Sequence, residues 1–323
     1  MARERKMEKL FDLTGKTAVV TGAGGVLCSE IAKALAEAGA KVAVLDLMED
    51  AAQKVADEIN KDNRRMVEDR RQAAENRRQF IEDRGDDAED KRYKSEDRRQ
   101  QERRSTTETK AIAVKCSVLD KKQLEDAKET IIDKLGGIDI LINGAGGNKK
   151  EATTSDALSF FDLPTDAIRA CLDLNIIGTL LPCQVFGTVM AQAKKGVILN
   201  VSSMNAFRPL TKICGYSAAK AAVSNFTQWL AVHINQNYSK DIRVNAIAPG
   251  FFLTEQNRFL LTDEKTGQPT PRGKTIIEHT PMGRFGQPCD LTGTMLWLVS
   301  DAAKFVTGIV VPVDGGFSAF SGV

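Results

Sequence analysis

The sequence lacks the residue combinations on which several classes of protein depend. Its six cysteines include no CxxC pair, so we expect no metal site and no disulfide framework, and a reducing cytoplasm suits them. Histidine occurs only at His233 and His279, neither beside a plausible nucleophile, which makes a Ser-His-Asp hydrolase hard to build. The formal net charge of +2 indicates no nucleic-acid partner. The charged start, residues 1–10, predicts no secretory signal, and no apolar run reaches the roughly 18 residues of a membrane span.

What the sequence does contain is the stretch GYSAAK at residues 215–220, preceded by Ser202 and Ser203. If residues 218–226 are helical, Tyr216 and Lys220 share one helix face because they are four residues apart. A nearby ammonium should lower the pKa of the phenol, and such a pair can exchange a proton with a hydroxyl or a carbonyl. Ser203 follows an apolar run, residues 197–201, and could bond the same oxygen. An ordinary surface tyrosine and lysine are the alternative for this spacing alone.

The second candidate site is a glycine-rich turn near the amino terminus. A β-branched run, residues 16–20, breaks at the turn TGAGG of residues 21–25, and a helical pattern follows. A second strand, residues 41–45, then ends at Asp46. This order is typical of dinucleotide-binding proteins, in which glycines admit the pyrophosphate and the acid bonds the adenosine ribose. Because Asp46 would repel a 2′-phosphate, the sequence favours NAD over NADP. A Gly-rich turn without a ligand is the alternative.

Together these motifs resemble the short-chain dehydrogenase/reductase family, from about residue 10 to residue 323. The family's catalytic Ser, Tyr and Lys match Ser203, Tyr216 and Lys220, and its helical Asn matches Asn175. The resemblance implies that Tyr216 is the general acid or base, Lys220 lowers its pKa and bonds the nicotinamide ribose, and Ser203 orients the substrate oxygen. Asn175 would hold a water in the proton path.

The resemblance is incomplete around the cofactor. The family turn TGxxxGxG has Val26 and Cys28 where its second and third glycines belong, and the family's NNAG has Gly144 in place of its second Asn. Ser117-Val118 replaces a common Asp-Val pair, which weakens the adenine contact. The resemblance implies these cofactor-binding residues: Thr21, Gly22, Gly24, Gly25, Val26, Leu27, Asp46, Ser117, Val118, Asn143, Ala145, Gly146, Tyr216, Lys220, Pro249, Gly250, Phe252 and Thr254.

Strand-like runs alternate with helical patterns along the rest of the sequence, which predicts an α/β fold with a doubly wound parallel sheet (Rossmann fold). Further strands are expected at residues 111–114, 138–142, 197–201, 241–248 and 309–313. A long apolar helix is predicted over residues 172–186 and an irregular lid over 251–286. We assign residues 1–61 and 105–323 to this one domain.

The remaining residues, 62–104, form a charged insertion. Glutamates at 68, 75, 82, 89 and 96 mark a strict seven-residue repeat of charged residues from Met66 to Gln100. Two interpretations are open: a solvated helix, with a turn at Gly85 that folds it into a hairpin, or a disordered insert. We favour the helix. Neither interpretation places chemistry in this segment.

For the substrate, residues 202–207, 225–230 and 248–257 look like the D-mannonate oxidoreductases of the short-chain type, which implies exchange between D-fructuronate and D-mannonate. Cationic and amide side chains near the site suit a sugar acid: Asn148, Asn205, Arg208, Lys212, Gln256 and Asn257 are the substrate candidates. A gluconate-type or sugar-alcohol dehydrogenase and a non-catalytic NAD-binding scaffold are the alternatives. Family resemblance further implies a homo-oligomer, a tetramer.

Overall fold

A seven-stranded parallel sheet forms the centre of the molecule, with the strand order β3-β2-β1-β4-β5-β6-β7. The computed structural model describes residues 10–84, 109–254, 258, 261–263 and 266–322. The strands are β1 (Thr17–Thr21), β2 (Lys41–Asp46), β3 (Ala111–Lys115), β4 (Ile140–Asn143), β5 (Gly196–Val201), β6 (Ile242–Pro249) and β7 (Val310–Val313). The predicted α/β fold is therefore confirmed, and each predicted strand is found with its ends shifted by at most two residues.

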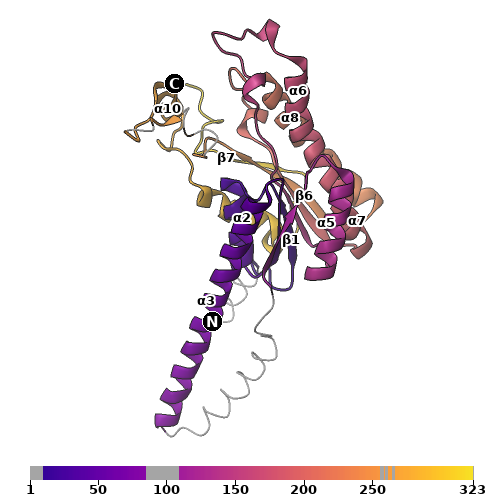
Figure 1. Ribbon diagram of the computed structural model, residues 1–323, viewed down its shortest axis with the longest axis vertical. Coiled ribbons are helices and arrows are strands. Elements are labelled where there is room, and N and C mark those ends of the chain that lie inside the picture. The colour runs from indigo at the N-terminus through magenta and orange to yellow at the C-terminus, as the bar shows by residue number, and fades with distance from the viewer. Residues whose placement is uncertain (1–9, 85–108, 255–257, 259–260, 264–265, 323) are drawn as a thin grey trace.

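Helices cover both faces of the sheet (Figure 1). One core contains buried residues of α2 (Val26–Glu37), α3 (Glu49–Arg84) and α11 (Thr292–Val299). The other contains those of α5 (Lys121–Leu135), α7 (Gly178–Ala193) and α8 (Cys214–Asn237). Successive strand residues enter opposite cores, as Val19 and Val20 do, because side chains alternate across a strand. Strands buried on both faces explain why their sequences read as continuous apolar runs.

The helix predicted over residues 172–186 is longer and is not uniform. It comprises α6 (Thr165–Leu172), a π-helical turn η3 (Asp173–Ile177) and α7. Among the described residues this stretch, Thr165–Ala193, is long and apolar enough to cross a membrane, contrary to the expectation from apolar run length. However, Phe186 and Met190 of α7 are fully buried in the core shared with α5 and α8. The stretch is thus a core helix.

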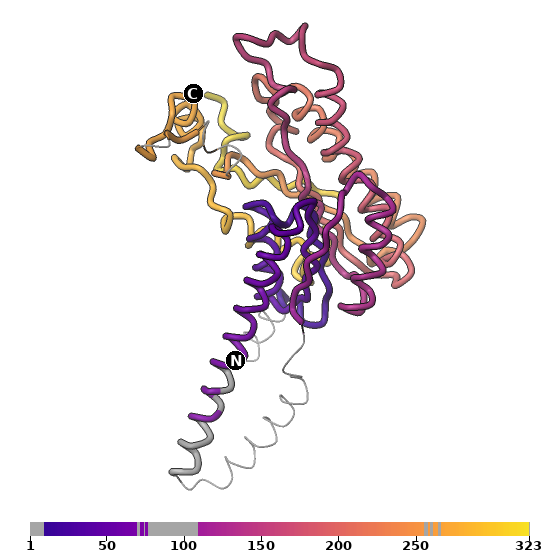
Figure 2. The backbone as a smooth tube through the Cα atoms, viewed as in Figure 1, coloured from indigo at the N-terminus to yellow at the C-terminus, as the bar shows by residue number. Residues whose placement is uncertain are grey.

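The helix α3 is 36 residues long and projects from the sheet (Figures 1 and 2). Its first turns pack on the core through Ala52, Val55 and Ile59, and it then continues as helix through the start of the predicted insertion, to Arg84. At 1.5 Å per residue the helix is about 54 Å long. The turn predicted at Gly85 and the later repeats lie outside the described residues, as do residues 1–9, so the insertion remains a prediction.

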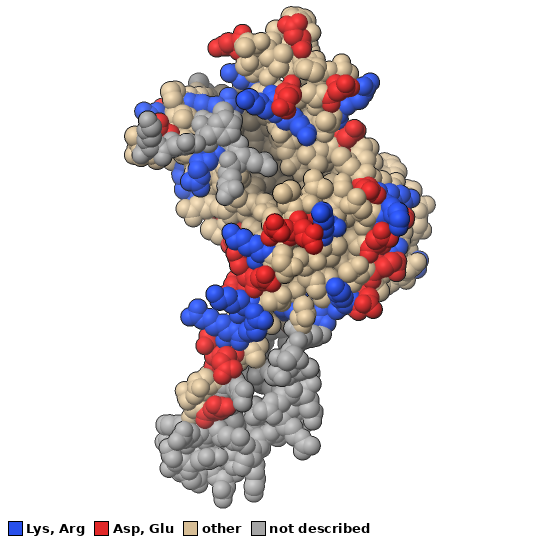
Figure 3. Space-filling view, in the orientation of Figure 1, with Lys and Arg blue, Asp and Glu red and all other residues tan. Residues whose placement is uncertain are grey.

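The lid is only partly irregular, contrary to the prediction for residues 251–286. It contains α10 (Pro271–Glu278), in which Thr270 caps the helix by accepting a bond from Gly273 N and Pro271 starts the first turn. The short elements η1 (Lys150–Ala152), η2 (Phe160–Asp162), η4 (Met204–Ala206), η5 (Pro288–Leu291) and η6 (Asp301–Ala303) complete the fold. On the face shown in Figure 3, acidic and basic side chains are interspersed.

Candidate active site

Two turns meet at the point where the strand order reverses. β1 pairs with both β2 and β4, so the turns after β1 and β4 lie side by side at the carboxyl edge of the sheet, where α/β proteins bind ligands. Gly22 has a φ of +66°, and a Cβ there would lie 2.8 Å from Ala145 Cα. Thr21 Oγ1 accepts hydrogen bonds from Gly144 N (3.1 Å) and Ala145 N (3.3 Å). The two turns therefore form one surface.

The predicted ribose ligand, Asp46, is held at the end of β2 by backbone amides. Its Oδ2 accepts a bond from Gly24 N and its Oδ1 one from Met48 N, both 2.9 Å. A Cβ at position 24 would lie 2.6 Å from Ala51 Cβ, so the turn can approach the carboxylate this closely only with glycine. Asp46 thus lies beside the glycine turn, as predicted, and its carboxylate orientation is fixed.

The catalytic candidates Ser203, Tyr216 and Lys220 come together at the same edge. Ser203 caps η4 just beyond the end of β5, and its side chain lies near enough to the phenol of Tyr216 to lower the pKa of that phenol by hydrogen bonding. Lys220 Nζ lies 5.6 Å from the centroid of the Tyr216 ring and donates a 2.8 Å bond to Val201 O. The shared helix face predicted for Tyr216 and Lys220 is confirmed.

The acidity of the pair differs from the expectation. Burial raises the pKa of Tyr216 to about 12, opposed by the hydrogen bond from Ser203. Burial also lowers the pKa of Lys220 to about 8. The pKa of the phenol is therefore raised and not lowered as predicted, because desolvation outweighs the other effects. Tyr216 holds its proton at neutral pH, which is the state that can donate to a carbonyl.

Asn175 is fully buried in η3 and braces the loop after β4. Its Oδ1 accepts a bond from Gly147 N (3.1 Å), and its Nδ2 donates to Gly147 O and Cys171 O (both 2.8 Å). A Cβ at Gly146 would lie 2.7 Å from Asn175 Oδ1 and 3.2 Å from Lys220 Nζ, so this loop passes directly over both side chains. Gly147 and the Val201 carbonyl are site groups that sequence reasoning missed, because backbone atoms carry no residue signature.

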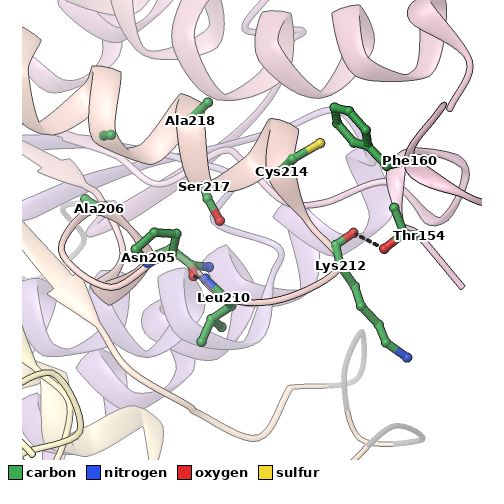
Figure 4. Close-up of a pocket in the computed structure, with 11 residues that line it drawn as sticks. Thr154, Phe160, Asn205, Ala206, Leu210, Lys212, Cys214, Ser217 and Ala218 are labelled. Atoms are coloured by element: carbon green, nitrogen blue, oxygen red, sulfur yellow. Dashed lines mark hydrogen bonds between the residues drawn. The ribbon is translucent and has the colours of Figure 1, made fainter. Parts of the chain in front are cut away.

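Two substrate candidates, Asn205 and Lys212, line a cavity of about 560 Å³ (Figure 4). Four residues of α8 also line it: Cys214, Ser217, Ala218 and Ala221. At 3.6 residues per turn these four lie on a different face of the helix from Tyr216 and Lys220. Asn205 Oδ1 accepts a bond from Leu210 N, and Lys212 has a left-handed backbone with a φ of +75°. The cavity thus lies on a different side of α8 from Tyr216 and Lys220, and Asn205 is linked to the catalytic candidates through its backbone N–H, which donates a 3.2 Å bond to Ser203 Oγ.

The other substrate candidates are distributed over several segments. Arg208 is exposed, and its Nε donates a 3.1 Å bond to Ser318 O near the carboxyl terminus. Asn148 Nδ2 donates to Thr153 Oγ1 at 2.7 Å. Gln256 and Asn257 lie outside the described residues.

The remaining cofactor candidates lie along the carboxyl edge of the sheet. Val118 packs against Gly178, and Ser117 accepts a bond from Leu119 N. Phe252 is buried, with its ring against Gly286, so its side chain is not exposed to a ligand. Asn143 Nδ2 donates a hydrogen bond to Asn200 Oδ1 (2.9 Å) on the neighbouring strand. This bond anchors the turn after β4, residues 143–146, which we call the floor turn.

The whole of this site lies within segments that match known sequence families. Residues 16–79 match the short chain dehydrogenase family, and residues 91–318 match the enoyl-(acyl carrier protein) reductase family. The chain belongs to the short-chain dehydrogenase/reductase family of oxidoreductases, whose members use NAD or NADP.

The chain is also similar to individual proteins of this family. The chain is 42% identical to an uncharacterized oxidoreductase, UxuB, of Bacillus subtilis over 97% of this chain and 98% of the other. It is also 42% identical to a proposed D-mannonate oxidoreductase from Haemophilus influenzae, solved with bound NAD, with a TM-score of 0.78 over 98% and 100% of the chains. A 7α-hydroxysteroid dehydrogenase complexed with NADH and a 7-oxo bile acid is 30% identical, with a TM-score of 0.71 over 95% and 96%. The resemblance to the D-mannonate oxidoreductases of the short-chain type is confirmed.

Proposed function

We propose that this protein is an NAD(H)-dependent oxidoreductase that interconverts D-fructuronate and D-mannonate. The observation that carries the proposal is the cluster of Ser203, Tyr216 and Lys220 beside the turns that follow β1 and β4. The relatives described above, one of which holds NAD, support the cofactor and the substrate class.

The residues at the carboxyl edge fit a dinucleotide. Gly22 and Gly24 let the glycine turn pack directly against Ala145 and Asp46, and the amino end of α2 directs backbone N–H groups toward this turn. Asp46 would bond the adenosine ribose, and its negative charge favours NAD over NADP. The floor at Asn143, Ala145 and Gly146 would lie under the nicotinamide. When bound, the cofactor supplies or accepts the hydride.

The side chains in and around α8 would transfer the proton. In ketone reduction Tyr216, protonated at neutral pH, donates its proton to the carbonyl oxygen as negative charge develops there. Ser203 donates a second hydrogen bond to that oxygen and so fixes its position. Lys220, charged below its pKa of about 8, stabilises the phenolate that remains and bonds the nicotinamide ribose. Asn175 positions the loop at Gly147, and we retain its predicted contact with a water.

The carboxylate of the substrate requires a cation at the mouth of the site. We propose Arg208 first, because its loop leads from Ser203 and its guanidinium is tethered to the carboxyl-terminal segment. Lys212 ranks second, since it lines the cavity on the other face of α8. Asn148, Asn205, Gln256 and Asn257 complete the proposed set of polar contacts.

The test compares substrates and variants. Reduction of D-fructuronate with NADH should exceed reduction of a neutral ketose by roughly ten- to a hundredfold, because a charge-assisted hydrogen bond contributes about 1.5–3 kcal/mol. Arg208→Met should raise KM for the acid and leave KM for the neutral ketose unchanged, and Lys212→Met serves as the matched comparison.

Each alternative has its own signature in this experiment. Equal rates on acid and neutral ketose would overturn the sugar-acid assignment and leave the oxidoreductase assignment standing. Faster turnover of a keto-gluconate or a sugar alcohol would favour the gluconate-type or sugar-alcohol alternative. A fluorescence titration that detects NADH binding, with no turnover of any of these substrates, would favour a non-catalytic scaffold.

Three further properties belong to the proposal. We propose a cytoplasmic enzyme, in keeping with six cysteines that are all free. We propose a homo-oligomer, a tetramer as family resemblance implies, with no nucleic acid or membrane partner. We also retain residues 62–104 as an insertion into a single domain formed by residues 1–61 and 105–323.

A further inference from the structure

Two departures from the family pattern, Cys28 and Gly144, touch each other. Cys28 is in the first turn of α2 and is 6% exposed, and Gly144 is in the turn after β4. A Cβ at position 144 would collide with Cys28 Sγ and would lie 3.0 Å from the carbonyl oxygen of Thr21. The sulfur of Cys28 therefore occupies the space that any side chain at position 144 would need.

The Cys28 thiol acts here as a packing group. Burial raises its pKa to about 12, opposed by the charge of Lys220 and aided by that of Asp46. The thiol stays protonated at physiological pH, so it is a poor nucleophile. A small apolar side chain at this position would fill the same space.

The contact joins two functional parts of the site. On one side is the amino end of α2, which would bind the pyrophosphate. On the other is the floor turn, which continues to Gly146 beside Asn175 and Lys220. Thr21 links both sides through its bonds to Gly144 N and Ala145 N. A change in the packing between Cys28 and Gly144 would shift one part relative to the other.

We propose that Cys28 and Gly144 are a matched pair of positioning residues that set the spacing between the pyrophosphate end and the catalytic end of the cofactor site. The pair rests on the proposed function, because it assumes that NAD lies along this edge. The interaction is steric: the sulfur atom of Cys28 on α2 fills the space that a side chain at position 144 of the floor turn would fill.

The test removes the sulfur at position 28 and adds a methyl group at position 144, first separately and then together. Gly144→Ala alone should collide with the sulfur, and Cys28→Ala alone should leave a void. In the double variant the Cβ of residue 28 would lie 3.5 Å from the Cβ at position 144, an ordinary contact, and only the 3.0 Å approach of that Cβ to the carbonyl oxygen of Thr21 would remain. We expect Gly144→Ala to weaken NADH binding about tenfold and Cys28→Ala to weaken it a few fold. The double variant should return to within about threefold of the wild type, since volume-conserving exchanges are tolerated best.

The measurements must distinguish a change in the spacing of the cofactor site from a loss of protein stability. ADP, which reaches only the adenosine and pyrophosphate end, should bind all four proteins within about twofold, because spacing matters only to a ligand anchored at both ends. Unfolding temperatures should show the same rescue, with the double variant above Gly144→Ala. The matched control is Gly293→Ala on the exposed side of α11, where a Cβ meets nothing within 4 Å. Combined with Cys28→Ala, it should give additive effects.

The possible results lead to different conclusions. Additive losses in NADH affinity and unfolding temperature for the double variant would overturn the pair and leave the proposed function intact. Equal losses for NADH and ADP would overturn the spacing role. If Gly144→Ala is insoluble, recovery of soluble protein in the double variant supports the pair, and failure to recover overturns it. A wild type that binds no NADH would overturn the proposed function and the spacing role together.

Discussion

The region around the amino end of α8 and the glycine turn after β1 form two parts of the proposed site, and they match the family in different ways. Around α8 the candidate side chains Ser203, Tyr216 and Lys220 are those of the family, because the proposed proton transfer depends on their atoms. At the glycine turn two family glycines are replaced, by Val26 and Cys28, yet the turn still fits closely against the floor through Gly22 and Gly144. Chemistry therefore constrains residue identity, whereas binding of a backbone-cradled ligand constrains shape. Different residues can provide the same shape.

The largest expected effect comes from removing one atom of the catalytic set. Tyr216→Phe should lower kcat by roughly 10²- to 10⁴-fold because the proton donor is lost. NADH affinity should stay within a few fold, since the phenol acts on the substrate. Steady-state kinetics and a fluorescence titration measure the two quantities. Turnover close to that of the wild type would remove the mechanism.

Lys220 should impose a pH dependence on ketone reduction. Because burial lowers its pKa to about 8, kcat/KM should be level below this pH and fall above it as the ammonium is lost. Lys220→Arg, whose charge persists, should move the fall to higher pH. A profile of kcat/KM from pH 6 to 10 tests this, and an unchanged profile in the arginine variant would assign the titration to another group.

The same group predicts how stability changes with pH. The folded pKa of Lys220 is about 8 and the ordinary value is 10.5. Between these values the unfolded state binds more protons, so the contribution of Lys220 to the free energy of unfolding rises with pH across this window. Lys220→Met should lack this rise. Unfolding temperatures of both proteins at pH 7 and pH 10 provide the comparison, and parallel changes would contradict the assignment.

A smaller effect is expected at Asp46, beside the glycine turn. Asp46→Ala should relax discrimination against NADP by about tenfold or more, because the carboxylate that would repel a 2′-phosphate is removed. Its loss also frees Gly24 N and Met48 N to bind the phosphate. The ratio of kcat/KM for NADH and NADPH measures this. Preference of the wild type for NADPH would show that Asp46 does not select the cofactor.

The smallest effect is expected from removing the predicted insertion. Deleting residues 62–104 and joining the ends by a short loop should preserve fold and activity within about twofold, because connections at the surface tolerate changes of length. Circular dichroism and the standard activity assay are sufficient. An insoluble or inactive product would mean that this segment packs on the core or on another subunit.

Strand positions could be predicted from the sequence because strands buried on both faces leave continuous apolar runs. The shared helix face of Tyr216 and Lys220 followed from their spacing alone. The acidity of Tyr216 did not, because it depends on how completely neighbouring segments exclude water. Nor did the contact of Cys28 with Gly144, which are 116 residues apart in the sequence. Their proximity depends on the pairing of β1 with β4. In the sequence alone, each residue therefore appears as an independent departure from the family pattern.

The π-helical turn at Asp173–Ile177 adds one residue to the long helix at the point that carries Asn175. Gly178 N bonds Asp173 O, five residues back, so the turn holds one residue more than an α-helix would. Removing one residue of this turn would restore regular α-helical winding and leave α6 and α7 in nearly the same mutual orientation, because a π-helical turn accommodates one extra residue. Phe186 would then stay in the core, whereas Asn175, which lies in the turn, would lose its position at Gly147. A single-residue deletion here should therefore preserve the fold and disturb the loop after β4, and unfolding temperatures measured together with NADH affinity would show whether the two effects separate.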